Sequence, residues 1–225
     1  MIGTVAAIAV GLLVGTRHAF EPDHLAAVST LVTTSRSPRG ATALGLMWGI
    51  GHTIALLAVG IALVLVDGLL PARLGIAFEL GVAAMLVLLG IRAVVRGVRN
   101  GGGMAGTHHH GATAHSHAGA GDHVHVGARA VAWRPLTIGL VHGLAGSGAL
   151  TALAFAELPT TAARVVYMLL FGLGSIAGMA LATGLAGAAL ARVARGGNAR
   201  RVLAITSGCA SCICGIAWAV PLLAG

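Results

Sequence analysis

The stretch Arg17-His18-Ala19-Phe20-Glu21-Pro22-Asp23-His24 decides how this chain has to fold. It lies inside an apolar segment, because residues 2–15 and 25–32 carry no charged side chain. A charged residue near the centre of a membrane span costs roughly 2.5–3.5 kcal/mol, and such residues are usually retained for a function. The stretch therefore indicates a functional site within a membrane crossing; the alternative is a polar network that only braces a kinked helix.

The composition is typical of a polytopic membrane protein. Of the 225 residues, 57% are hydrophobic and 9% are charged, whereas soluble domains carry about a quarter charged residues. Mean hydropathy is +0.93. Crossing the bilayer takes about 20 apolar residues, and six stretches qualify: 3–33, 41–66, 72–96, 135–157, 161–191 and 201–224. The sequence predicts an all-α fold of about six transmembrane helices, the first broken near Pro22 because proline cannot continue a helical hydrogen-bond ladder.

The arginines predict the orientation in the membrane. Eleven of the 14 lie in or beside the connections after the first, third and fifth spans, and only Arg73 and Arg164 lie on the opposite side. Cytoplasmic loops carry the excess of positive charge. We therefore expect both termini outside a prokaryotic-type plasma membrane, unless the first segment forms two short crossings. Because topology accounts for the basic charge, no nucleic-acid partner is expected.

Two pairs of segments indicate an internal duplication. Residues 15–19 resemble 139–143, and residues 49–51 resemble 172–174, at offsets of 124 and 123 residues. Three crossings per copy would make the second copy inverted, an arrangement common in secondary transporters. The predicted organisation is a first three-helix half at 1–99, a His-rich cytoplasmic loop at 100–128 and a second three-helix half at 129–225.

His18, Asp23 and His24 are predicted to bind a divalent transition metal. On a continuous helix the two imidazoles would point about 120° apart, but an unwound turn at Pro22 can aim both rings and the carboxylate into one cavity. Imidazole and carboxylate groups suit Ni²⁺, Co²⁺ and Zn²⁺. His52, which lies about midway along the second span, is predicted to be the fourth ligand.

Glu21 and His142 are candidate pathway residues. Glu21 lies four residues after Arg17 and would pair with it on a continuous helix. His142 occupies the position related to His18 by the duplication. It is interpreted as a pathway residue, a second ligand or a histidine that packs between helices.

The loop between the halves is rich in histidine. Its composition is typical of weak, multiple metal binding. A loop without fixed structure cannot hold one coordination geometry, so the hypothesis is a cytoplasmic metal buffer or sensor; the alternative is a solvated linker. The histidines are His108, His109, His110, His115, His117, His123 and His125.

These motifs resemble those of the nickel/cobalt transporter family, particularly its UreH-type, nickel-efflux-like branch. The family motif R-H-A-x-D-A-D-H-I corresponds to residues 17–25, with the H-x4-D-H core intact, Glu21 in place of an aspartate and Pro22 in place of an alanine. A second family element, G-H-S-T, corresponds to Gly51-His52-Thr53 without its serine. The resemblance implies high-affinity uptake of Ni²⁺ or Co²⁺, with the metal site in the first span.

The predicted function is a secondary permease that brings Ni²⁺ or Co²⁺ into the cytoplasm, with the metal as substrate and no cofactor. The expected partners are the metal ion and the lipid bilayer. Two alternatives stay open: an exporter loaded from the His-rich loop, and a non-translocating membrane protein that serves nickel-enzyme maturation proteins. An enzyme is not expected, since the chain has no H-E-x-x-H motif.

Overall fold

The computed structural model describes residues 2–35, 37–100, 107–110, 113–116, 123–126, 129–193 and 197–224, with side chains described for 10–35, 37–99, 133–146, 158–193 and 198–224. Its helices are α1 (Ile2–His18), α2 (Pro22–Val32), α3 (Pro38–Leu65), α4 (Ala72–Asn100), α5 (Trp133–Glu157), α6 (Thr161–Val193) and α7 (Gly197–Ala224). Within the described residues, α3, α4, α6 and α7 are long and apolar enough to cross a membrane. The protein is thus a polytopic helical membrane protein, as predicted.

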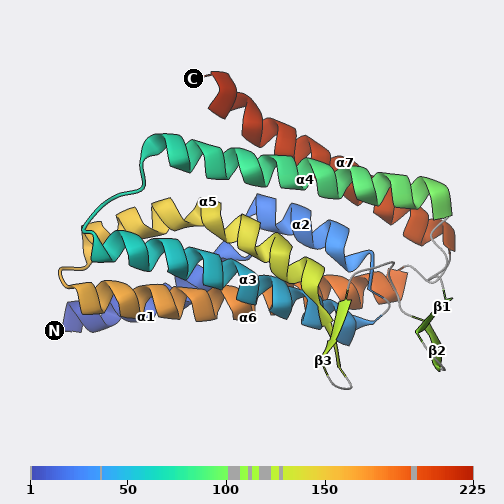
Figure 1. Ribbon diagram of the computed structural model, residues 1–225, viewed down its shortest axis with the longest axis horizontal. Helices are drawn as coiled ribbons and strands as arrows, with labels where there is room; N and C mark the ends of the chain where they lie inside the picture. The colour runs from blue at the N-terminus through green and yellow to red at the C-terminus, as the bar shows by residue number, and fades with distance from the viewer. Residues whose placement is uncertain are drawn as a thin grey trace.

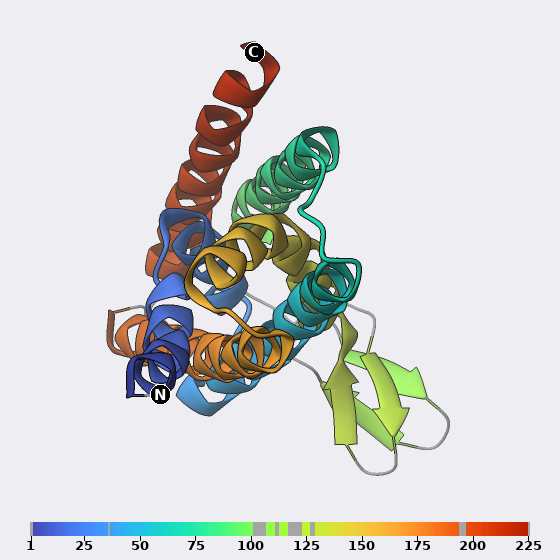
Figure 2. The same ribbon diagram turned by 90° about the vertical axis from the view of Figure 1, so that its left-hand side faces the viewer.

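The helices alternate in direction along the long axis of the bundle (Figure 1). Together, α1 and α2 run the same way beside α3, an arrangement that fits the predicted single broken crossing. Both ends of the chain lie at one end of the bundle, which we call the terminal end. The end of α4 and the start of α5 lie at the opposite end. Figure 2, viewed from the terminal end, shows α5 surrounded by the other helices.

Proline chemistry places the break in the first crossing. α1 ends at His18, and a tight turn follows in which the Phe20 and Glu21 amides donate to the carbonyls of Arg17 and His18 at 2.9 and 3.0 Å. Pro22 then begins α2 at the first helical position, where a missing N–H costs nothing. The break therefore lies where the sequence predicted it.

Close helix contacts repeat between the two halves. A Cβ at Gly15 would press on the backbone of Phe171, and a Cβ at Gly139 would press on the backbone of Trp48. The glycines are 124 residues apart and their two partners 123, which are the offsets of the duplication. Accordingly α1 packs against α6 as α5 packs against α3.

Contacts between α4 and α7, the third helix of each predicted half, also repeat at a constant sequence offset. A Cβ at Gly97 would meet the carbonyl of Arg201, and a Cβ at Gly215 would meet the carbonyl of Ala83. Gly215 lies 118 residues after Gly97, and Arg201 lies 118 residues after Ala83. The glycine is therefore on α4 in the first contact and on α7 in the second. Corresponding helices run in opposite directions (Figure 1), so these contacts fit an inverted arrangement.

The segment between α4 and α5, which includes the His-rich loop, contains backbone pairing that the sequence did not predict. Strands β1 (Thr107–His110) and β2 (Thr113–Ser116) form one antiparallel hairpin, and β3 (His123–Val126) and β4 (Arg129–Ala132) form another. The expectation of a loop without regular structure was therefore wrong for these residues. A β-hairpin forms by local backbone pairing across a short turn, so the low hydrophobicity of this segment did not exclude it.

Candidate metal site

His18, His24 and His52 form the first of two ligand groups. His18 ends α1, His24 lies in the first turn of α2, and His52 lies in the middle of α3. One potential ligand atom from each lies within 4.8 Å of the others. Metal–imidazole bonds of roughly 2.1 Å place ligand nitrogens about 3–4 Å apart. Shifts on the order of 1 Å would thus bring all three onto one ion.

Asp23, His24 and His142 form the second group, which shares His24 with the first. The His142 Nε2–H donates to Asp23 Oδ2 at 2.7 Å, and the ring centroids of His24 and His142 lie 4.1 Å apart. The three side chains come from two crossings, α2 and α5. Because both groups contain His24, the site is a single cluster of four histidines and one buried carboxylate.

Carboxylates orient two of the rings. The His18 Nδ1–H donates to Glu21 Oε2 at 2.9 Å, and the His24 Nδ1–H donates to Asp23 Oδ1 at 3.1 Å. In the neutral imidazole, a proton on Nδ1 leaves Nε2 free to bind a metal. Histidine ligands in metal sites are typically held by carboxylates in this way.

The free ring nitrogens are buried. His18 Nε2, His24 Nε2, both nitrogens of His52 and His142 Nδ1 have no hydrogen-bond partner among the described residues. A buried polar atom without a partner costs about 1–3 kcal/mol, so these five would cost roughly 5–15 kcal/mol in total. A divalent cation with affinity for imidazole would recover part of that cost. The donor set therefore fits a transition metal.

Glycines of α5 bring His142 to the cluster. Gly139 and Gly143 lie against the backbone of Trp48 and His52 in α3, with no room for a Cβ. The two helices can approach closely at this level because glycine has no side chain. His142, between these glycines in sequence, is only 1% exposed.

The site does not follow the symmetry of the predicted duplication. His142 corresponds to His18, whereas His52 corresponds to Ser175, which donates to the Gly15 carbonyl at 3.3 Å. The second half has no counterparts of Glu21 and Asp23, and α5 continues without a break where the first crossing is interrupted. The carboxylates and the unwound turn thus belong to the first half alone.

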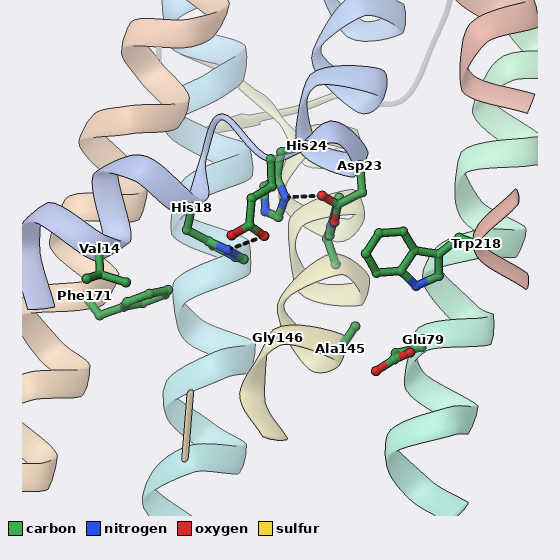
Figure 3. Close-up of a pocket in the computed structure, with 11 residues that line it drawn as sticks. Val14, His18, Asp23, His24, Glu79, Ala145, Gly146, Phe171 and Trp218 are labelled. Carbon is green, nitrogen blue, oxygen red and sulfur yellow. Dashed lines mark hydrogen bonds and ion pairs between the residues drawn. The ribbon is translucent and has the colours of Figure 1, made fainter. Parts of the chain in front are cut away.

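A cavity of about 290 Å³ adjoins the cluster (Figure 3). Its wall includes His18, Glu21, Asp23, His24 and His142. Farther along, Glu79 of α4 and Trp218 of α7 line it, on the opposite side from Val14 and Phe171. The N-terminus of α4 and the C-terminus of α7 both lie at the terminal end (Figure 1), so the cavity extends toward that end.

The predicted site residues meet, but with different partners from those expected. Asp23 contacts His24 and His142, and it is absent from the group formed by His18, His24 and His52. Glu21 contacts His18; the expected pairing with Arg17 was wrong, because α1 ends before a helical turn can join the two residues. Metal binding by these residues stays a prediction.

The predicted metal-buffer histidines cannot be compared with the structure. His117 lies outside the described residues, and the side chains of the other six also lie outside the description. Their backbone pairing in the hairpins is all that the structure adds.

Sequence reasoning missed the aromatic residues around the cluster. The ring of Trp48 lies 5.5 Å from that of His24 and 5.7 Å from that of His142, and the ring of Phe171 lies 5.3 Å from that of His18. Trp48 precedes His52 by four residues, so helical spacing alone would have placed both on one face.

Comparison with known proteins establishes the family. The chain is 32% identical over 187 residues to the urease accessory protein UreH of Bacillus sp. (strain TB-90), a match that covers 83% of this chain and 78% of that protein. No protein-family model matches the chain, and no solved structure matches it significantly. Together with the motifs around His18 and His52, this identity shows that the chain belongs to the UreH-type branch of the nickel/cobalt transporter family.

Proposed function

We propose that this membrane protein is a secondary permease, not an enzyme, and that it carries Ni²⁺ or Co²⁺ into the cytoplasm. The observation that carries the proposal is the convergence of His18, His24 and His52 inside a polytopic helical bundle. One ring nitrogen of each lies within 4.8 Å of the others, and each ring has a buried nitrogen without a partner among the described residues. Imidazole nitrogens are suitable ligands for these borderline divalent ions.

Each side chain has a distinct part in the proposed transport step. The substrate ion exchanges water for the Nε2 atoms of His18 and His24 and for a ring nitrogen of His52. Glu21 and Asp23 hold the first two rings and offset the charge of the ion. Because His24 belongs to both ligand groups, it can stay bound while the ion exchanges His18 and His52 for Asp23 and His142.

The position of the cavity supports uptake. It extends from the cluster toward the terminal end, and the distribution of arginines predicts that this end is outside. In the proposed orientation the histidine hairpins face the cytoplasm, where they would bind the released ion. Rearrangement of the two halves about the cluster would then open the opposite end.

Uptake of radioactive nickel into vesicles that contain only the purified protein tests the proposal. We expect saturable uptake by the wild type, reduced to background by His24→Ala and strongly reduced by His18→Ala. Thr206→Ala, at an exposed position on α7, is the control for expression and insertion. Wild-type rates in both histidine variants would eliminate this site from the transport path. Competition by cobalt and zinc would define selectivity.

The same vesicles separate the permease from an accessory protein, the role named in the description of the Bacillus relative. A protein that passes nickel to urease maturation proteins without translocation would bind nickel in detergent but leave the vesicle interior empty. An exporter would lower nickel accumulation and raise nickel tolerance in expressing cells, whereas a permease would have the opposite effects.

A further inference from the structure

Glu79 lines two cavities on the terminal side of the histidine cluster. It lines the cavity of about 290 Å³ that holds the cluster and also a second cavity of about 330 Å³. The second cavity is formed by the connection between α3 and α4, the start of α4 and Leu222 of α7, and all of its other lining residues are apolar. Glu79 is the single residue that lines both. An ion that moves from the terminal end to the histidines by this route passes its carboxylate.

The carboxylate of Glu79 has no partner among the described residues. The chain has six acidic residues, and three of them, Glu21, Asp23 and Glu79, line the cavity beside the cluster. The first two contact histidines, whereas the half-buried Glu79 makes no hydrogen bond or ion pair with any described residue. Figure 3 shows its carboxylate at the side of the cavity away from His18. A carboxylate in this position attracts a cation that enters the cavity.

We propose that Glu79 is an outer station on the access path, where a hydrated divalent ion is held before it reaches His18, His24 and His52. This inference rests on the proposed permease function. The cavity beside the cluster has room for several waters at about 30 Å³ each, so an ion can arrive with water still bound. Glu79 attracts it through that water, and the histidine nitrogens then replace the water.

Removing the charge of Glu79 should change the association rate of nickel more than its equilibrium affinity. A divalent ion and a carboxylate about 6 Å apart in water attract each other by the equivalent of about tenfold in local ion concentration. Glu79→Gln should therefore slow nickel association about tenfold at low salt and change dissociation less than about threefold. Raising the ionic strength should shrink the difference, because salt screens the attraction across the wet cavity.

Stopped-flow quenching of tryptophan fluorescence by Ni²⁺ measures this rate in detergent-purified full-length protein. Trp218 lines the cavity and Trp48 lies beside His24, so both report arrival of the ion. Glu79→Asp retains the charge and should restore most of the rate. Asp67→Asn is the matched control, since Asp67 is an exposed acidic residue in the connection between α3 and α4 and lines neither cavity.

The outcomes distinguish this inference from the permease proposal. Slow association in Glu79→Gln, with near-normal rates in Glu79→Asp and Asp67→Asn, supports the station. An unchanged rate in Glu79→Gln, or equal slowing in Asp67→Asn, overturns it while the vesicle results stand. If the wild type binds nickel with this pattern but transports none, the permease fails and the station holds. A wild type that binds no nickel overturns both.

Discussion

Replacing Asp23 with asparagine should weaken nickel binding about 100- to 1,000-fold. Asp23 accepts hydrogen bonds from two buried rings, His24 at 3.1 Å and His142 at 2.7 Å. Asparagine has one acceptor oxygen and one donor NH₂, so it cannot accept from both rings in their present tautomers. Hydrogen bonds to charged groups contribute about 1.5–3 kcal/mol each. Weakening two of them by roughly 1.5–2 kcal/mol each gives 3–4 kcal/mol, or about two to three powers of ten in Kd.

Glu21→Gln provides the internal comparison. The Glu21 side chain is 51% exposed and accepts from one ring, that of His18, whereas the Asp23 side chain is 10% exposed. Loss of one outer carboxylate contact from a metal ligand typically costs 10- to 100-fold in affinity. Partial exposure to water places Glu21→Gln near the lower value, so it should cost about tenfold.

Equilibrium binding of radioactive nickel to each purified variant measures the difference, and thermal unfolding in detergent checks that the variants are folded. Asp67→Asn should bind as the wild type does, because its exposed pair with Arg164, at 3.4 Å, lies outside the site. Wild-type affinity in Asp23→Asn, or a larger loss in Glu21→Gln than in Asp23→Asn, would refute the assignment of these two carboxylates.

Two further changes test the packing of α5 against α3 and the role of the His-rich loop. Gly139→Ala should lower the free energy of unfolding by about 1–3 kcal/mol and impair nickel binding, because its Cβ would meet the Trp48 carbonyl. Gly81→Ala, whose Cβ would have no neighbour within 4 Å, should be neutral or slightly stabilising. Equal losses in the two variants would contradict the packing argument. Deletion of residues 107–125 should preserve nickel uptake into vesicles while lowering nickel retention in cells, and loss of uptake by a correctly inserted deletion protein would rule out the buffer hypothesis.

The positions of the crossings follow from local properties of the chain. Each of the six predicted spans overlaps one helix or, for the first, the pair α1 and α2. Apolar length and the absence of an amide proton at Pro22 act within a few residues, so they can be recognised without any tertiary information. The hairpins between Thr107 and Ala132 were missed because their pairing depends on the backbone and leaves little signal in hydropathy.

The sequence by itself also determined which residue types lie in the membrane crossing: His18, Glu21, Asp23 and His24 are ionisable residues in an otherwise apolar segment. Only the tertiary structure decided which partner each of these side chains contacts. The turn at Pro22 directs Glu21 to His18, and the contact of Gly139 and Gly143 with α3 brings His142 to Asp23. It also decided that Glu79 lines the same cavity. These relations depend on the distance between helices far apart in sequence, and that distance is set by backbone contacts at glycine, which hydropathy does not encode.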